Sequence, residues 1–205
     1  MNPIDAKTRA GRGVPVPRFP AVLGWDVSGE VAATGPNTRL LRKGDAVFGM
    51  LRFPEIASAY AEYVVGPEQH LAHKPEALDH RAAAASPMVA LTAWQALFEH
   101  ARVEAGQRVL VHGASGGVGH IAVQLARWKG AYVIGTASAR NHDFLRQIGA
   151  REVVDYSRQP LGSSAKDVDV VIDSRGGDDF LALLGVLRDG GTIVSCSGRP
   201  TASSC

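Results

Sequence analysis

A glycine-rich segment between a strand-like run and a helix-like run constrains the fold of this 205-residue chain more than any other feature. The segment is Leu110–Ala126, LVHGASGGVGHIAVQLA, in which apolar residues with helical spacing follow the glycines. Gly116 and Gly119 match the second and third glycines of the Gly-x-Gly-x-x-Gly pattern, and Ala114 stands at the first. Such a turn brings backbone N–H groups and a helix N-terminus to a dinucleotide pyrophosphate. Glycines also occur in ordinary turns, so a purely structural turn is the alternative.

The chain around this segment alternates strand-like and helix-like runs. Alternation of this kind builds βαβ units, and these form a parallel sheet with helices on both faces. We therefore predict an α/β fold with a Rossmann-type doubly wound parallel sheet for residues 79–205. The expected strands are Arg108–His112, Tyr132–Thr136, Glu152–Asp155, Val168–Asp173 and Thr192–Cys196, and the expected helices are Val118–Lys129, Asn141–Ile148 and Asp178–Leu187.

Residues 1–78 have a different pattern, in which glycine, proline and short β-rich runs alternate. We expect strands within Val27–Gly35, Lys43–Met50 and Ala61–Gly66, and hence a small all-β domain. An Ala-rich, helix-favouring stretch begins at Asp79, so we place the domain boundary there.

Composition excludes several classes of partner. The chain has 22 basic and 20 acidic residues without a basic block, which argues against nucleic acid or an anionic membrane as a partner. No apolar stretch is long enough to span a bilayer. Cys196 and Cys205 form neither a Cys-x-x-Cys pair nor a disulfide framework, so we expect a cytoplasmic protein.

The end of the second expected Rossmann strand indicates which dinucleotide binds. An NAD site usually has an acidic residue about 20 positions after the glycines, to bind the ribose 2′-hydroxyl. No Asp or Glu occurs between His120 and His142, where Ser138 and Arg140 stand instead. A hydroxyl and a guanidinium suit a 2′-phosphate, which favours NADP(H), although Arg140 is alternatively a solvated surface residue. Tyr156 is expected either near the adenosine or half-buried at a strand end.

Eight ordered segments resemble the medium-chain dehydrogenase/reductase superfamily, in particular its zinc-independent quinone oxidoreductase branch. They are NPIDAKTRAG at Asn2, GWDVSGEVAATG at Gly24, KGDAVFG at Lys43, YAEYVV at Tyr60, LTAWQAL at Leu91, VLVHGASGGVGHIAVQLA at Val109, GAREVVDY at Gly149 and DVVIDSRGG at Asp169.

The resemblance implies a partial GroES-like β domain in residues 1–78 and an NADP-binding Rossmann domain in residues 79–205. It also implies that the dinucleotide lies in the cleft between them and that hydride goes to a quinone or an α,β-unsaturated carbonyl. Family members have strands before the Asn2 segment and a sixth strand with a dimer edge after the fifth. We therefore expect a chain truncated at both ends and a homodimer only in a longer form, with a non-catalytic NADPH-binding protein as the alternative.

The resemblance also implies roles for individual residues. Asn2 and Asp5 are expected near the nicotinamide, and Tyr60 is expected either to face substrate and donate a proton or to pack within the β domain. These three are the predicted catalytic residues. The predicted cofactor-binding residues are Thr92, Ala114, Ser115, Gly116, Gly117, Val118, Gly119, Ser138, Arg140, Tyr156 and Ser197.

A departure from zinc-dependent relatives leads us to expect no metal. The zinc branch has Gly-His-Glu where this chain has Gly24-Trp25-Asp26, and a catalytic zinc needs three protein ligands. His70 and His73 have a His-x-x-His spacing, but no third ligand is evident. Arg175 stands where the family often has a small apolar residue, and it is expected either near the nicotinamide or in solvent.

Overall fold

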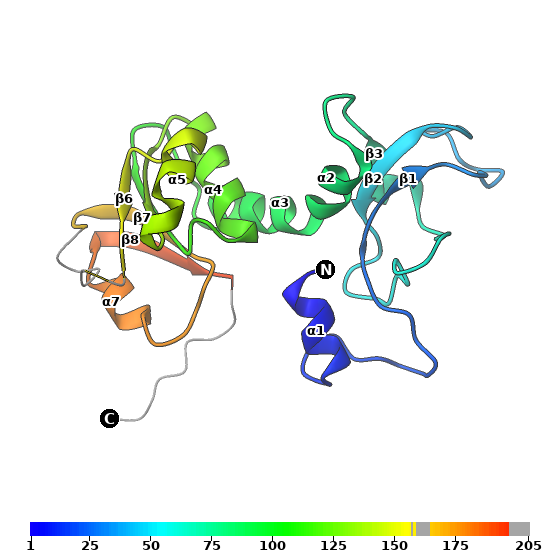
Figure 1. Ribbon diagram of the computed structural model, residues 1–205, viewed down its shortest axis with the longest axis horizontal. Coiled ribbons are helices and arrows are strands. Elements are labelled where there is room, and N and C mark those ends of the chain that lie inside the picture. Colours follow the sequence, from blue (N-terminus) through cyan, green and yellow to red (C-terminus); the bar gives the residue numbers. More distant parts are fainter. Residues whose placement is uncertain (157, 159–164, 197–205) are drawn as a thin grey trace. The chain divides into compact units, whose positions relative to one another are not determined.

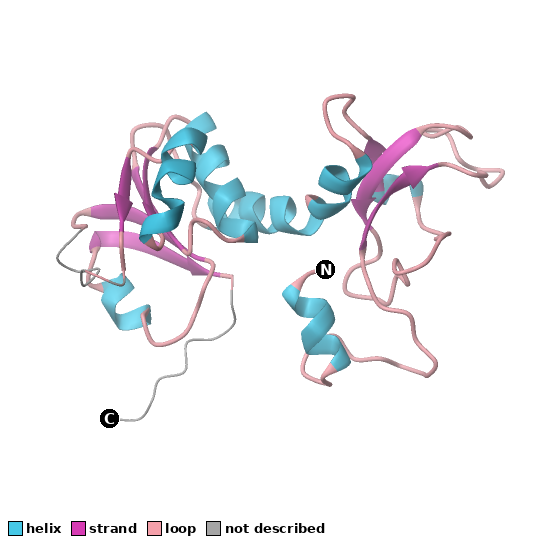
Figure 2. Cartoon of the chain, viewed as in Figure 1, coloured by secondary structure: helices cyan, strands magenta, loops and turns pink. Residues whose placement is uncertain are grey.

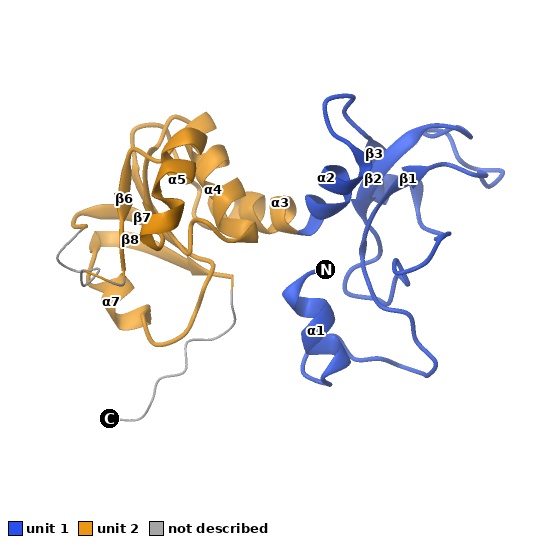
Figure 3. Ribbon diagram, in the orientation of Figure 1, with its two compact units in different colours: residues 1–88 blue, residues 89–205 orange. Residues whose placement is uncertain are grey.

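The chain forms two compact units, Met1–Met88 (unit 1) and Val89–Cys205 (unit 2) (Figure 3). The structure, a computed structural model, describes residues 1–156, 158 and 165–196. Unit 1 extends beyond residue 78 because the chain as far as Met88 packs on its core. The Met88 side chain contacts the cluster of Trp25 and Leu51, and its backbone N–H donates to Asp26 at 3.0 Å.

Unit 1 is built on a three-stranded antiparallel sheet in the order β1-β2-β3 (Figure 1). Asp26 pairs with Met50, and Val47 pairs with His73, so the sheet is a β meander. Its elements are α1 (Pro3–Arg9), β1 (Asp26–Glu30), β2 (Ala46–Met50), the 3₁₀ turn η1 (Glu68–His70), β3 (Leu71–His73) and α2 (His80–Ala85).

The strand predicted at Ala61–Gly66 is wrong. That segment has no strand hydrogen bonds, and β3 takes the free edge of β2 instead. Tyr63 and Val65 are 80% and 82% exposed. Their apolar pattern therefore buries little surface, and burial is what stabilises a strand of this kind.

Unit 2 confirms the predicted Rossmann-type sheet. Five parallel strands lie in the order β6-β5-β4-β7-β8, and helices connect several of them (Figure 2). The elements are α3 (Pro87–Trp94), the π-helical segment η2 (Gln95–His100), β4 (Arg108–His112), α4 (Gly117–Trp128), β5 (Tyr132–Thr136), the 3₁₀ turn η3 (Ala139–Asn141), α5 (His142–Ile148), β6 (Glu152–Val154), β7 (Val168–Asp173), α7 (Phe180–Leu184) and β8 (Leu187–Ser195).

Alternate residues of the central strand enter two separate cores. Val109 and Val111 lie with the apolar side of α4 and with Leu145 of α5. Leu110, between them, lies with Leu183 of α7 on the opposite face. Because successive strand residues point to opposite faces, a strand buried on both sides reads as a continuous apolar run. Within the described residues, every helix is too short or too polar to cross a bilayer.

Candidate functional site

The turn between β4 and α4 depends on its glycines. The Gly116 N–H donates to the Gly113 carbonyl at 2.9 Å, and Gly113 has φ 72°. A Cβ at Gly119 would overlap the Gly113 carbonyl oxygen and would lie 2.8 Å from the Cα of Ala114. Gly119 therefore allows the first turn of α4 to lie directly on the end of β4.

The N-terminus of α4 presents backbone donors to solvent. Gly116 is the N-cap, and Gly116 and Gly117 are exposed. The first N–H groups of a helix have no partner within the helix, and the helix dipole places positive potential there. The side chain of Ala114 is fully buried and that of Val118 is half-buried. We therefore expect these residues to contact a ligand through their backbone atoms. This arrangement fits the pyrophosphate of a dinucleotide.

Asn141 connects the glycine-rich turn to the end of β5. Its side-chain Nδ2 donates to the hydroxyl of Ser115 at 3.1 Å and lies 3.5 Å from that of Ser138. Arg140 beside it is exposed, and no carboxylate follows β5 before Asp143. Asn141 was not among the residues predicted from the sequence, although its position at the start of α5 is typical of a residue that bonds to nearby turns.

Four side chains form a closed cluster at the carboxyl ends of β4, β6 and β7. Nε2 of His112 lies 3.3 Å from Oδ2 of Asp179, and Nη1 of Arg175 lies 3.5 Å from the same oxygen. The Arg175 guanidinium lies over the Tyr156 ring, 4.6 Å from its centroid. The ring centroids of Tyr156 and His112 are 6.0 Å apart. One face of Tyr156 is thus occupied by Arg175.

Burial keeps the central histidine of this cluster neutral. His112 is completely buried, and this burial lowers its pKa despite the nearby carboxylates of Asp173 and Asp179. Nδ1 of His112 lies 2.9 Å from the Thr136 hydroxyl, across the β4–β5 pair. The Asp173 carboxylate accepts the backbone N–H groups of Arg175 and Gly176 at 3.0 and 2.8 Å. The chain after β7 is therefore held against the strand end.

In unit 1, the predicted residues Asn2, Asp5 and Tyr60 gather around Asp26. The Asn2 backbone N–H donates to Oδ2 of Asp5 at 2.6 Å, and its side-chain Nδ2 donates to Oδ2 of Asp26 at 2.8 Å. Burial raises the pKa of Asp26, although the hydrogen bonds from Nδ2 of Asn2 and from the Met88 backbone N–H act against it. Burial, followed by the Asp5 carboxylate and the charge of Asp26, raises the pKa of Tyr60 to about 12. Asp26 was not among the site residues predicted from the sequence.

Two further predicted cofactor-binding residues, Thr92 and Ser197, belong to neither of these two clusters. Thr92 is half-buried on α3 of unit 2. Ser197 lies outside the described residues. Among the residues that the structure does describe, no group of three or more His, Cys, Asp or Glu side chains is arranged to hold a metal ion. The expectation of a zinc-independent site stays a prediction.

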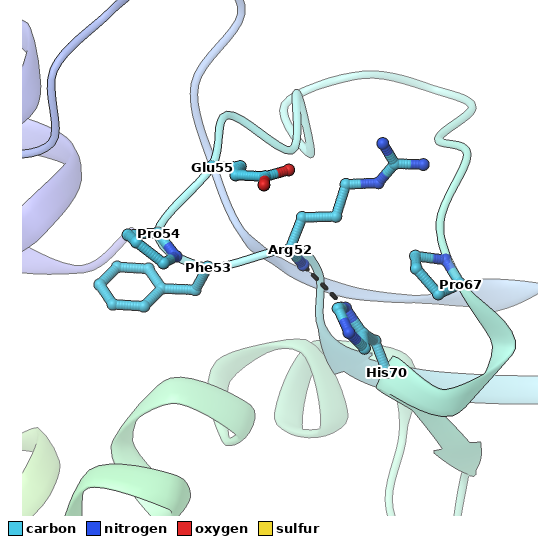
Figure 4. A pocket seen from close by; sticks show the side chains of 6 residues that line it. All are labelled: Arg52, Phe53, Pro54, Glu55, Pro67 and His70. Carbon is cyan, nitrogen blue, oxygen red and sulfur yellow. Dashed lines mark hydrogen bonds between the residues drawn. The ribbon is translucent and has the colours of Figure 1, made fainter.

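A cavity of about 420 Å³ lies in unit 1, and its lining includes none of Asn2, Asp5, Asp26 or Tyr60 (Figure 4). Trp25, which precedes Asp26, connects the two regions. Its indole N–H donates to the Glu55 carbonyl at 2.6 Å, and its ring meets that of Phe53 edge-on. The lining residues are Arg52, Phe53, Pro54, Glu55, Pro67 and His70.

Comparisons with known proteins match both units. Residues 1–76 match the family described as alcohol dehydrogenase GroES-like domain, and residues 117–204 match that described as zinc-binding dehydrogenase. The chain belongs to the medium-chain dehydrogenase/reductase superfamily, in its quinone-oxidoreductase-like branch. This membership confirms the predicted order of a GroES-like domain followed by a Rossmann-type domain.

Relatives and solved structures are similar over nearly the whole chain. A chloroplastic quinone-oxidoreductase homolog of Spinacia oleracea is 37% identical over 98% of this chain, which spans 64% of that protein. The quinone oxidoreductase structure from Coxiella burnetii is 42% identical, with a TM-score of 0.88 over 95% of this chain and 63% of its own. The Escherichia coli quinone oxidoreductase in complex with NADPH is 30% identical, with a TM-score of 0.85 over 100% of this chain and 64% of its own.

Proposed function

We propose that this chain is a cytoplasmic, NADPH-dependent oxidoreductase that transfers hydride to a quinone or an α,β-unsaturated carbonyl without zinc. The observation that carries the proposal is the open N-terminus of α4, packed on β4 through Gly119, beside a β5 end that has Arg140 and no carboxylate. The relatives named quinone oxidoreductase and the relative bound to NADPH support it.

Unit 2 supplies the dinucleotide contacts in this proposal. The backbone N–H group of Gly117 binds the pyrophosphate, since Gly117 is exposed at the positive end of α4. Ser138 and Arg140 bind the 2′-phosphate by a hydroxyl and a charge-assisted hydrogen bond. Tyr156 contacts the adenosine with the ring face that Arg175 leaves open.

The residues proposed to act on the substrate lie in unit 1. When bound, the nicotinamide supplies a hydride, and negative charge then develops on the substrate oxygen. Tyr60 is 48% exposed, and a pKa of about 12 keeps its phenol protonated at neutral pH. It therefore offers a hydrogen bond to the developing oxyanion. Asn2 orients the cluster, and Thr92 contacts the dinucleotide from α3.

Two assays test this proposal. Titration with NADPH, followed by nucleotide fluorescence, should show saturable binding, and no binding at millimolar NADPH would contradict the proposal. Consumption of NADPH in the presence of a simple quinone then separates a reductase from the alternative, a non-catalytic NADPH-binding protein. Binding with turnover eliminates that alternative, and binding without turnover on quinones or enones favours it.

A further inference from the structure

Arg175 follows β7 at the point where the helices of unit 2 change sides of the sheet. After β4 the chain enters α4, which packs on the face that includes Val111. After β7 it enters α7, whose Leu183 packs with Leu110 on the opposite face. β4 and β7 are neighbours, and ligands of open α/β sheets bind outside the carboxyl ends of the strands at such a switch point. Arg175 thus stands across the switch point from the glycine-rich turn.

The backbone of Arg175 is fixed beside that turn. A Cβ at Gly113 would lie 3.3 Å from the Cβ of Arg175 and 3.7 Å from its backbone nitrogen. The Ser174 hydroxyl donates to the His112 carbonyl at 2.7 Å, which ties the end of β7 to the end of β4. The Asp173 carboxylate accepts the Arg175 N–H at 3.0 Å. The side chain of Arg175 therefore starts next to Gly113, the first residue of the turn.

The Arg175 guanidinium is stacked but keeps unused donors. Its central carbon lies 4.6 Å from the centroid of the Tyr156 ring, and its Nη1 lies 3.5 Å from Oδ2 of Asp179. Across the residues that the structure describes, the side chain makes no hydrogen bond. Stacking occupies the face of the planar group and leaves the N–H donors at its edge for other partners. The side chain is 47% exposed, so a ligand can reach these donors from solvent.

The contact between Arg175 and Asp179 is one that a ligand can replace. Both side chains are nearly half exposed, and exposed ion pairs of this kind contribute little to stability. The same Asp179 oxygen lies 3.3 Å from Nε2 of His112, a fully buried atom without a hydrogen-bond partner among the described residues. When Arg175 turns to a ligand, the Asp179 carboxylate therefore keeps His112 and water as its neighbours.

We propose that Arg175 binds the pyrophosphate of the dinucleotide, exchanging Asp179 for phosphate oxygens while its guanidinium stays stacked on Tyr156. The assignment rests on the proposed function, because it needs a dinucleotide at the glycine-rich turn. A guanidinium can pair with phosphate oxygens through two parallel N–H···O bonds, which a single backbone amide cannot do. Arg175 thus adds a side-chain cation to a turn that otherwise offers backbone donors.

Arg140 and Arg175 then contact different parts of one ligand. Arg140, after β5, is proposed for the 2′-phosphate, which NADPH has and NADH lacks. The pyrophosphate occurs in both dinucleotides. β5 and β7 lie on opposite sides of β4, so the chain leaves these two strands about 10 Å apart. Arg140 therefore sets the preference for NADPH, whereas Arg175 sets the affinity for either dinucleotide.

Dinucleotide titrations of matched variants test the assignment. Arg175→Gln removes the charge and should weaken NADPH and NADH binding by the same factor, roughly 10- to 100-fold, as loss of a charge-assisted hydrogen bond does. Arg175→Lys keeps the charge without the planar fork and should recover part of that loss. Arg146→Gln is the control, because Arg146 is another exposed arginine of unit 2 and pairs with Asp143 at 3.0 Å on α5. It should leave both affinities unchanged.

Phosphorus NMR separates a direct contact from a structural effect. The pyrophosphate and the 2′-phosphate of NADPH give separate ³¹P signals. With each variant saturated, Arg175→Gln should shift the bound pyrophosphate signals and leave the bound 2′-phosphate signal in place. Arg140→Ala should do the reverse. A substitution that only loosened the fold would shift both sets of signals.

Each outcome decides a separate point. Affinities of Arg175→Gln within about twofold of wild type overturn the assignment, and so does tighter binding, which would show that Arg175 obstructs the site. A loss confined to NADPH, or a shift of the 2′-phosphate signal alone, also overturns it, since Arg175 would then contact the 2′-phosphate. Absence of NADPH binding to the wild-type chain overturns the proposed function, and the assignment with it, and is seen before any variant is made.

Discussion

Each unit of this chain buries one side-chain atom that has no hydrogen-bond partner among the described residues: Oδ1 of Asp5 in unit 1 and Nε2 of His112 in unit 2. The surroundings of the two atoms differ. His112 has the Asp179 carboxylate 3.3 Å away, and Arg175 and Tyr156 close the cluster on its open side. Within the described chain, no cation lies within ion-pair distance of Asp5.

We interpret His112 and Asp179 of unit 2 as structural and the Asp5 cluster of unit 1 as the one that acts on substrate. In unit 2, the unpaired nitrogen of the neutral His112 lies 3.3 Å from the Asp179 carboxylate, within a cluster of side chains at the carboxyl ends of three parallel strands. In unit 1, the unpaired oxygen belongs to a buried carboxylate that adds to the effect of burial in raising the pKa of Tyr60, a residue that is 48% exposed. Substitutions in unit 2 should therefore change stability and dinucleotide binding, whereas those at Asp5 and Tyr60 should change turnover.

Gly119→Ala should have the largest effect of the unit 2 substitutions. Its Cβ meets the backbone of Gly113 and Ala114, which cannot move aside as a flexible side chain could. We expect the free energy of unfolding to fall by about 3 kcal/mol and NADPH binding to be lost. Denaturant unfolding and fluorescence titration measure both effects. Gly29→Ala, at a position where a Cβ meets nothing within 4 Å, is the control and should change neither quantity.

Arg140→Ala should weaken NADPH binding by roughly 10- to 100-fold, which corresponds to the loss of a charge-assisted hydrogen bond of about 1.5–3 kcal/mol. NADH, which has no 2′-phosphate, should bind the variant and the wild type alike. Arg151→Ala removes another exposed cation of unit 2 and serves as the control. Equal losses for NADPH and NADH would contradict the assignment of Arg140 to the 2′-phosphate.

The buried histidine should make unit 2 less stable in mild acid. Burial lowers the pKa of His112 in the folded chain, so the unfolded chain binds the proton at higher pH. Stability from this residue is complete above pH 6.5 and is lost as pH falls below it, by at most about 1.4 kcal/mol per pH unit. Urea unfolding at pH 7 and pH 5.5 measures the slope. His112→Asn should flatten it and His73→Asn should not; an unchanged slope in His112→Asn would refute the argument.

Asp179→Asn should have the smallest effect. It removes the carboxylate that faces both His112 and Arg175, but the Asp179 side chain is 43% exposed and the ion pairs are screened by water. We expect a loss of about 0.5–1 kcal/mol in the free energy of unfolding. The neighbouring Asp178→Asn should cost less than Asp179→Asn. A loss of 3 kcal/mol or more would show that the cluster behaves as a buried ion pair.

Much of unit 2 was predictable because its strands are buried on both faces. β4, β5 and β7 span the predicted residues, since continuous apolar runs between glycine or charged boundaries leave little ambiguity. The prediction of a strand at Ala61–Gly66 was wrong, because the sequence pattern is that of a half-buried strand whereas Tyr63 and Val65 are exposed to solvent.

The site was less predictable than the fold, because its contacts join residues far apart in the chain. The glycine-rich turn has a local pattern, and Ser138 and Arg140 follow from strand spacing. The pairing of His112 with Asp179, and of Asn2 with Asp26, depends on how strand ends and α1 meet, which no local pattern specifies. Asp5 and Tyr60 were singled out by family resemblance alone.

We propose that NADPH binds at the glycine-rich turn and the end of β5. Backbone amide NMR of the wild-type chain with and without NADPH tests this most directly. We predict that the largest shifts fall on the amides of Gly116, Gly117 and Gly119 and of Ser138 and Arg140, with smaller shifts for an equal concentration of NADH. Saturable binding that leaves these five amides unmoved, or equal shifts with NADH at Arg140, would contradict the account.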